Sequence, residues 1–169
     1  VSDGALDSAV ATVSSSVSPV VVPPTAPVAQ SATLTVTEDT PVNLVLTATD
    51  VNNDALTYSV TRSPANGSLS GTPPNLRYTP NADYFGSDSF DFRANDGNSN
   101  SATATISISV SPVNDTPFAA EQNVAVSVNT PLPIVLNGSD KETASLTYTV
   151  VSGPSHGSLS GSAPNLTYS

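Results

Sequence analysis

A long internal repeat constrains the fold of this chain more than any other feature of its sequence. The segment LTYSVTRSPANGSLSGTPPNLRYT, residues 56–79, returns without a gap as LTYTVVSGPSHGSLSGSAPNLTYS, residues 146–169, at an offset of 90 residues. A duplication of this length does not arise by chance, and a fixed period of this size is the signature of a tandem array of similar units. We therefore expect repeated domains rather than one large domain.

The same register extends over other parts of the chain and sets the limits of each unit. At the same offset Pro27 matches Pro117, and residues 8–20 match residues 101–113 at an offset of 93. Because the chain opens on Val1 rather than Met, we expect a processed piece or a fragment. The predicted parts are residues 1–26, the C-terminal strand of a preceding repeat plus a linker; residues 27–116, one complete repeat; and residues 117–169, the N-terminal part of a following repeat.

Apolar and polar residues alternate in the complete repeat, which is the pattern of β-strands with one buried face. Pro, Gly, Ser and Thr are frequent throughout the chain, and these residues disfavour helix. Seven such strands in about 90 residues are typical of a two-sheet β-sandwich. The predicted strands cover residues 31–37, 42–48, 55–61, 68–70, 75–79, 88–94 and 102–110.

The alternation also predicts which side chains fill the interior of this sandwich. The fold class predicted from the pattern is all-β, as tandem seven-stranded sandwiches with one complete and two partial repeats. We expect the Asn66-Gly67 pair to form the tight turn between the third and fourth strands. The predicted inward residues are Leu34, Val36, Val42, Leu44, Leu46, Leu56, Tyr58, Val60, Leu76, Tyr78, Phe90, Phe92, Ala94, Ala104, Ile106, Ile108 and Val110.

Composition excludes several classes of function. The 169 residues carry a net charge of −10, and so acidic a surface repels nucleic acid and anionic lipid. No run of about 18 apolar residues is present, so we expect no direct insertion into a membrane. The chain has no cysteine, which excludes disulfide and thiolate chemistry, and the complete repeat has no histidine, so zinc is a poor choice of metal.

No arrangement of residues predicts catalysis. His156 is the only histidine, and it stands in a turn where the complete repeat has Asn66. A catalytic triad built on His156 would be expected in both units, and the matching unit lacks it. Asp88 and Asp91 share a strand that faces no evident cleft, so we assign them surface or junction roles rather than those of paired glycosidase carboxylates. We predict no enzyme activity.

Acidic residues concentrate in the loops at the two poles of the predicted sandwich. Ca²⁺ takes six to eight oxygens from carboxylates, amides and backbone carbonyls, although Asp and Asn also serve simply as turn formers. At the opposite pole from the main set, Asp50, Asp54 and Asp96 are weaker candidates for Ca²⁺. The candidate Ca²⁺ site at the junction of the complete and following repeats comprises Glu38, Asp39, Asp83, Asp88, Asn114, Asp115 and Asp140.

The linker before the complete repeat lacks this acidity. Its sequence VVVPPTAP, residues 20–27, has no carboxylate where the second linker reads VNDTP, residues 113–117. Its prolines favour a stiff, extended spacer instead. In the following repeat Asn129 replaces Asp39, and no acid matches Glu38. We therefore do not expect every junction of such an array to bind calcium alike.

Several motifs together carry a family resemblance. They are TEDTPVNLVLTATD (37–50), LTYSV (56–60), PANGSLSG (64–71), YTPNADYFGSDSFDF (78–92), ANDG (94–97) and SPVNDTP (111–117). This combination resembles the bacterial immunoglobulin-like, cadherin-like tandem repeats of large secreted surface adhesins. The resemblance covers nearly the whole chain, and it implies a seven-stranded sandwich, arrays of many copies, secretion to the cell surface, and often Ca²⁺ at or near domain junctions.

Three hypotheses of function remain open. The first is a non-catalytic segment of an extracellular adhesin or surface protein, an extended and Ca²⁺-stiffened stalk in adhesion or biofilm matrix that contacts the neighbouring repeats. The second is a filament subunit, in which residues 1–20 of one copy complete the C-terminal half-domain of another by donor-strand exchange. The third is a carbohydrate-binding module using the outward Thr103, Thr105, Ser107 and Ser109, although the aromatic residues are expected to point inward.

Overall fold

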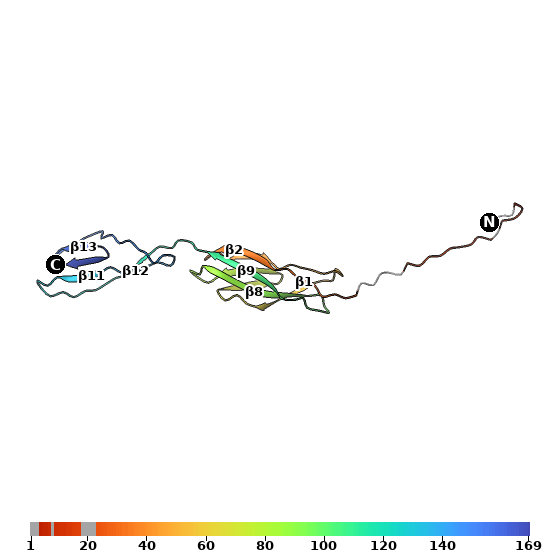
Figure 1. Cartoon of the computed structure of the whole chain (residues 1–169), viewed down its shortest axis with the longest axis horizontal. Coiled ribbons are helices and arrows are strands. Elements are labelled where there is room, and N and C mark those ends of the chain that lie inside the picture. Colours follow the sequence, from red (N-terminus) through yellow and green to blue (C-terminus); the bar gives the residue numbers. More distant parts are fainter. Residues whose placement is uncertain (1–3, 8, 18–22) are drawn as a thin grey trace.

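The computed structural model describes residues 4–7, 9–17 and 23–169, and within them all regular structure is β (Figure 1). Two groups of strands lie end to end along the long axis of the molecule (Figure 1). Strands β1 to β9 fall between residues 28 and 111, and β10 to β14 between residues 118 and 168. The described residues form no helix, so none of them lies in a helix that could span a membrane.

Two facing sheets form the sandwich of the complete repeat. One has the strand order β2-β9-β8-β5 and the other the order β3-β7-β6, while β1 pairs separately with β4. Strand β2 runs parallel to β9, and β8 is antiparallel to both β9 and β5. The bounds are β1 Val28–Ala29, β2 Ala32–Thr37, β3 Val42–Val45, β4 Ala48–Thr49, β5 Thr57–Arg62, β6 Gly67–Thr72, β7 Asn75–Pro80, β8 Gly86–Asn95 and β9 Ala104–Ser111.

The interior of this sandwich consists of the residues that the alternation predicts. Tyr78, Phe90 and Phe92 expose no surface, and Leu46 is 2% exposed. Burying each such side chain stabilises the fold by about 1.5–3 kcal/mol. Every other predicted inward residue is buried or half-buried, so the predicted core is confirmed.

Three details of the predicted strands are wrong. The strand predicted over residues 42–48 is interrupted after Val45, because β3 pairs with β7 whereas β4 pairs with β1. The strand predicted over residues 68–70 extends over Gly67–Thr72. The Asn66-Gly67 pair is not a hairpin turn, because β5 and β6 belong to different sheets. Gly67 is instead required for space, since a Cβ there would lie 2.5 Å from the Tyr78 ring.

The following unit repeats one sheet of the complete repeat and lacks the other among its described residues. Its sheet β11-β14-β13 matches β3-β7-β6, and its pair β10 and β12 matches β1 and β4. Residues 122–127 and 147–152, which match β2 and β5, are described and form no strand. The bounds are β10 Phe118–Ala119, β11 Leu132–Val135, β12 Gly138–Ser139, β13 Leu159–Ser162 and β14 Asn165–Tyr168.

The N-terminal part is described only in pieces. Residues 9–17, which match β9 in sequence, form no strand in the described structure, and Val10, Val13 and Val17 are 92–95% exposed. The predicted C-terminal strand and linker of residues 1–26 also include residues 1–3, 8 and 18–22, which lie outside the described residues. The limits of the three parts of the chain stay predictions from the repeat.

Candidate metal centre at the junction

The junction between the complete repeat and the following unit gathers carboxylates from both. Glu38 and Asp39 follow β2, Asp83 precedes β8, Asp115 lies in the linker, and Glu142 follows β12. The pKa of Asp115 is raised by partial desolvation and then by the negative charges of Glu142, Asp83, Glu38 and Asp39. We call these five carboxylates, whose charges all act on Asp115 or belong to it, the junction cluster. No three of them have ligand oxygens within 4.8 Å of one another in the described structure.

Glu38 is the most deeply buried member of the junction cluster, with 1% of its surface exposed. Its Oε1 accepts a hydrogen bond from the backbone N–H of Val113 at 2.6 Å, which ties the end of β2 to the linker. Its Oε2 is buried and has no hydrogen-bond partner among the described residues. Leaving a buried acceptor without a partner costs about 1–3 kcal/mol, and more when the group is charged. A cation bound beside Oε2 of Glu38 would therefore be stabilising.

Glu142 supplies the same arrangement from the other unit. Its Oε2 accepts a hydrogen bond from the backbone N–H of Asp115 at 2.9 Å, while Oε1 is buried without a partner in the described structure. The sequence analysis missed Glu142, because its counterpart in the complete repeat is the uncharged Asn52. The signal that identifies it is the run Asp140-Lys141-Glu142, two acids flanking one base in a loop at the acidic pole.

Hydrogen bonds made by Asp140, Asp39 and Asn114 shape the loops that carry the junction cluster. Asp140 Oδ1 accepts the backbone N–H groups of Glu142 at 3.1 Å and Thr143 at 2.8 Å. Asp39, at a φ of 56°, accepts the backbone N–H of Asp83 at 3.2 Å. Asn114 donates its side-chain N–H to the carbonyl of the next residue at 3.0 Å. These bonds hold the loops in the conformations that bring the junction cluster together.

Lys141 brings a positive charge to the junction cluster. Its Nζ lies 2.7 Å from Oδ2 of Asp83, and the side chains are 59% and 36% exposed. The pKa of Lys141 is raised by its hydrogen bond to Asp83 and by the acidic charges around it. An ion pair so exposed contributes about 0–1 kcal/mol. One ammonium group therefore does not compensate five carboxylates.

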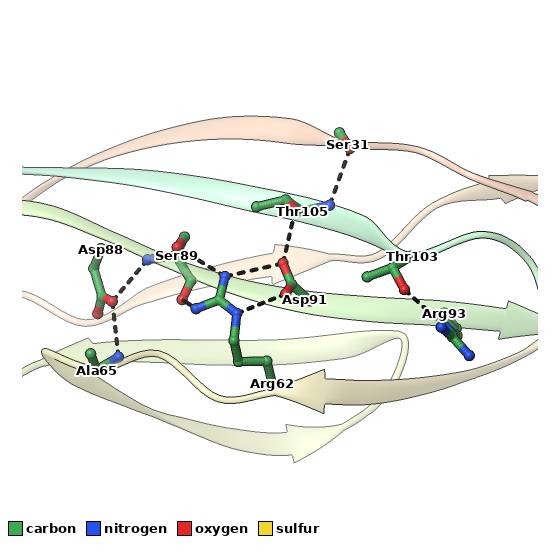
Figure 2. A network of polar contacts seen from close by, with 9 residues as sticks. All are labelled: Ser31, Arg62, Ala65, Asp88, Ser89, Asp91, Arg93, Thr103 and Thr105. Carbon is green, nitrogen blue, oxygen red and sulfur yellow. Dashed lines mark hydrogen bonds and ion pairs between the residues drawn. The ribbon is translucent and has the colours of Figure 1, made fainter.

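Asp88, also a candidate for the junction, is engaged by hydrogen bonds inside the sandwich. It is 8% exposed, and its carboxylate accepts the backbone N–H groups of Ala65 at 3.0 Å, Asn66 at 3.1 Å and Ser89 at 2.8 Å. It also accepts the hydroxyl of Tyr78 at 2.8 Å, and burial together with this bond raises the pKa of Tyr78. Asp88 thus anchors the crossing from β5 to β6, which Figure 2 shows in part.

The weaker Ca²⁺ candidates at the opposite pole also lie close to one another. Asp50, Asp54 and Asp96 present carboxylate oxygens that all lie within 4.8 Å of one another. Asp50 Oδ1 accepts the backbone N–H of Asp54 at 3.1 Å, and its Oδ2 is buried with no partner in the described part of the chain. Hydrogen bonds from the backbone N–H groups of Ser99 and Asn98 lower the pKa of Asp96.

The donor set of the junction cluster fits Ca²⁺. Its ligand atoms are carboxylate oxygens, which hard divalent cations prefer, and Ca²⁺ accepts six to eight of them in a flexible geometry. Glu38 Oε2 and Glu142 Oε1 are buried oxygens without hydrogen-bond partners in the described residues, and they come from different units. Glu38 and Glu142 are the members of the junction cluster that would hold Ca²⁺ through these oxygens. The carboxylates of three residues already lie within 4.8 Å of one another only at the opposite pole, in Asp50, Asp54 and Asp96, among the described residues.

The outer face of the four-stranded sheet carries a separate polar network (Figure 2). Arg62 binds Asp91 through two nitrogens, at 2.7 and 3.1 Å, and Thr105 donates its hydroxyl to Asp91 at 2.8 Å. Thr103 accepts a hydrogen bond from Nε of Arg93 at 3.0 Å. The hydroxyls of Thr103 and Thr105, considered for carbohydrate binding, are thus engaged by neighbouring side chains of the same face.

The structure also bears on the predictions made for Asp88 and Asp91 and for the phenylalanines. Asp88 points into the sandwich whereas Asp91 lies on its outer face, so the two carboxylates do not flank a common site. The expectation that all phenylalanines point inward is wrong, because Phe85 is 40% and Phe118 is 65% exposed. Phe85 stands just before β8, and Phe118 lies on the two-residue strand β10. His156 is exposed, and its backbone carbonyl accepts the Tyr168 hydroxyl.

Comparison with known proteins identifies the family. The family model of the bacterial Ig domain matches residues 24–109, just over half of the chain. The chain belongs to the bacterial Ig domain family. Ig-like domains of this kind are in general non-catalytic. No curated protein matches this bacterial Ig domain chain at a significant level.

The chain is also similar to several solved structures. Human CDH23 EC21-23 matches with a TM-score of 0.53 and 15% identity, over 85% of this chain and 53% of that one. Protocadherin gamma B2 extracellular cadherin domains 3-6 match with a TM-score of 0.49 and 18% identity, over 84% and 38%. An endo-fucoidan hydrolase of glycoside hydrolase family 107 matches at 0.42 and 21%, over 85% and 24%. The chain thus spans between a quarter and about half of these structures, and the first match shows a cadherin-like β-sandwich fold.

Proposed function

We propose that this chain is a structural segment of an extracellular bacterial surface protein, an extended stalk whose junction between the two units is stiffened by Ca²⁺. One observation carries the proposal. Two buried carboxylate oxygens, Glu38 Oε2 from the complete repeat and Glu142 Oε1 from the following unit, have no hydrogen-bond partner in the described structure. A cation that takes both oxygens would join the two units.

Electrostatics explains why the cation would stiffen the stalk. Without it, the junction cluster holds five carboxylates against the ammonium of Lys141, and their mutual repulsion favours separation of the loops. With it, the repulsion becomes attraction between groups on both units. In an array each repeat contacts mainly its neighbours, so the stiffness of the junction sets the reach of the whole rod.

An extracellular location suits a Ca²⁺ site built from loop carboxylates. Extracellular Ca²⁺ modules bind with dissociation constants of about 10⁻⁴–10⁻³ M, a range that a loop-borne carboxylate cluster reaches without a preformed cage. The neighbouring repeats are the direct partners of the segment. Presentation of an adhesive region away from the cell, at the surface or within a biofilm matrix, is the role we propose for the rod.

A calcium titration of the 169-residue chain tests the proposal. We expect Ca²⁺ at about 1 mM to narrow the distribution of angles between the two units in small-angle X-ray scattering and to raise the melting temperature of the following unit. Glu142→Gln keeps the shape of the side chain and removes its charge, so it should weaken the Ca²⁺ response at least about tenfold. Scattering profiles and melts that coincide in Ca²⁺ and in chelator would refute the metal site.

A matched substitution separates the site from general charge. Glu121→Gln makes the same chemical change in the same unit at an exposed position outside the junction cluster. It should leave the Ca²⁺ response unchanged. An equal loss of response in Glu121→Gln and Glu142→Gln would show that net charge, rather than a site, is responsible.

A second candidate function is self-association by strand exchange. Residues 9–17 expose Val13 and Val17, whose counterparts Ile106 and Val110 are buried on β9. The following unit in turn exposes 44% of Val126, whose counterpart on β2 is buried beside β9. A strand resembling β9 from a second copy would add to that unpaired segment. Concentration-dependent assembly that survives deletion of residues 1–20 would refute this candidate.

A further inference from the structure

The two linkers of the chain make the same hydrogen bond at matching positions. Before the complete repeat, the backbone N–H of Thr25 donates to Oδ1 of Asn52 at 3.2 Å, across 27 residues. Before the following unit, the backbone N–H of Asp115 donates to Oε2 of Glu142 at 2.9 Å, also across 27 residues. Both partners are related by the offset of 90 residues. At each junction, therefore, a backbone N–H of the linker donates a hydrogen bond to one side chain of the following loop.

The chemistry of this shared contact differs between the junctions. At the first junction the Thr25 hydroxyl also donates to Asn52 Oδ1 at 2.9 Å, and Asn52 Nδ2 donates to the Pro23 carbonyl at 3.2 Å. The amide of Asn52 thus bonds the linker through both its oxygen and its nitrogen, without any charge. At the second junction Glu142 keeps a buried oxygen without a partner in the described residues, and Asp115 adds a further negative charge.

The loop frame beneath the contact is the same in both units. Asp50 Oδ1 accepts the backbone N–H of Asn52 at 2.8 Å, and Asp140 Oδ1 accepts that of Glu142 at 3.1 Å. The exchange of Asn for Glu is therefore a change of side chain on an unchanged loop. The acids Asp50, Asp54 and Asp96 stand near the first junction, but all three belong to the complete repeat.

We propose that two positions decide whether a junction of this chain depends on a cation: the linker position 25 or 115, and the loop position 52 or 142. Thr25 and Asn52 form a neutral latch that holds the linker without metal. Asp115 and Glu142 form the charged version, which holds the linker firmly only when a cation compensates it. The second half of this inference rests on the Ca²⁺ site proposed above; the neutral latch does not.

The consequence is a rod with two kinds of joint. A joint of the Thr25 and Asn52 type keeps its geometry when calcium is removed, because the contact that holds the linker is uncharged. The carboxylates beneath it, Asp50, Asp54 and Asp96, all belong to one unit, so no repulsion between units arises there. A joint of the Asp115 and Glu142 type loosens when calcium is removed, because the repulsion described above returns. Calcium would then tune bending at chosen places along the array rather than along its whole length.

Amide hydrogen exchange, followed residue by residue by NMR in the 169-residue chain, tests the latch. Asn52→Ala should raise the exchange rate at Thr25 about three- to tenfold, as expected for the loss of a net hydrogen bond, equally in Ca²⁺ and in chelator. Chelation alone should raise exchange at Asp115 and leave Thr25 within about twofold of its starting rate. Exchange at Leu76 on β7 reports in every variant that the sandwich remains folded.

Exchanging the two versions of the contact tests the assignment of the determinants. Thr25→Asp with Asn52→Glu should make exchange at position 25 sensitive to calcium. Asp115→Thr with Glu142→Asn should abolish calcium sensitivity at position 115. The inference is overturned if Thr25 in the unaltered chain responds to chelation as strongly as Asp115, or if both exchanges leave the two responses as they were.

The result also separates this inference from the proposed function. If chelation leaves amide exchange at Asp115 unchanged while Asn52→Ala raises exchange at Thr25, the neutral latch is supported. The Ca²⁺ site and the charged half of the inference are then both refuted. If chelation raises amide exchange at Asp115 but Asn52→Ala leaves exchange at Thr25 unchanged, the Ca²⁺ site is supported and the latch is refuted.

Discussion

Residues 32–37 and 122–127 occupy matching places in the two units, yet only the first segment is a strand. In the complete repeat, β2 pairs along its whole length with β9, and Val36 is 7% exposed. In the following unit the described residues include no strand matching β9, and Val126, the counterpart of Val36, is 44% exposed. The difference teaches that alternation prepares a segment for a sheet, while a partner strand makes it one.

The other sheet shows the opposite behaviour. The sheets β3-β7-β6 and β11-β14-β13 form in both units, and Leu76 and Leu166 on their central strands are 6% and 8% exposed. The strands of this sheet come from one continuous half of the repeat, so both units contain all of them. This sheet therefore forms without the facing sheet, whereas β2 and β5 depend on β8 and β9.

Supplying the missing partners should have the largest effect on this comparison. A copy of residues 80–111 joined after Ser169 would continue the repeat in register. We expect residues 122–127 and 147–152 to become strands, with a gain of about 1.5–3 kcal/mol for each large apolar side chain newly buried. NMR chemical shifts and thermal melts would measure the change. The control is the same extension with Asp in place of Phe90 and Phe92 in the added copy only. If both extensions turn residues 122–127 into a strand, the partner explanation is contradicted.

Truncating one leucine in each central strand should reveal the next largest difference. Leu76→Ala removes a side chain packed between two sheets and should cost about 2–5 kcal/mol in the free energy of unfolding. Leu166→Ala should cost less than half as much, because the described part of its unit has no facing sheet across from it. Denaturant unfolding with residue-level probes in each unit would compare the two, and equal losses would show that the second unit packs as tightly as the first.

Removing one hydroxyl from each unit should give a smaller contrast. Tyr78→Phe deletes a hydrogen bond to the buried carboxylate of Asp88 and should cost about 1.5–3 kcal/mol, the range of bonds to charged groups. Tyr168→Phe deletes a bond to the backbone carbonyl of the exposed His156, which water replaces, so no change should be measurable. Denaturant unfolding with probes in each unit would measure both changes. A comparable loss of unfolding free energy in both variants would contradict the assignment of Asp88 as the anchor.

The smallest effect expected is a pH dependence confined to the second junction. The pKa of Asp115 is raised in the folded chain, so its protonated form favours the closed junction, and this stability is lost as the pH rises through that pKa. In the absence of Ca²⁺ we expect slower amide exchange around position 115, relative to intrinsic rates, at about pH 4 than at about pH 7. Asp115→Asn should remove this dependence.

The opposite pole provides the control for this experiment. The pKa of Asp96 is lowered by hydrogen bonds from the backbone N–H groups of Ser99 and Asn98. Its contribution to stability is therefore present above the usual pKa of aspartate and is lost only as the pH falls below that range. The loop of Asp96 should stay protected between about pH 7 and pH 4. A parallel change at both poles would point to a general effect of acid rather than to Asp115.

Sequence patterns predicted the interior of the complete repeat well, because alternation is a property of the strand itself. Phe90 and Phe92 follow the period of two and are buried. Gly67 was interpreted as a turn residue, whereas its place depends on the Tyr78 ring of another strand. Asp88 was assigned to the junction by its position near a loop, but three backbone N–H groups and a tyrosine hydroxyl engage it in the sandwich.

The repeat period, the identity of the core residues and the acidity of one pole are properties that the sequence by itself determined. Tertiary structure alone decided that Glu142 bonds the linker at Asp115 and that Asp88 is engaged inside the sandwich by Tyr78. The physical reason is one of distance along the chain. Alternation and composition are read within a few residues, whereas strand pairing and the gathering of charges depend on partners tens of residues away.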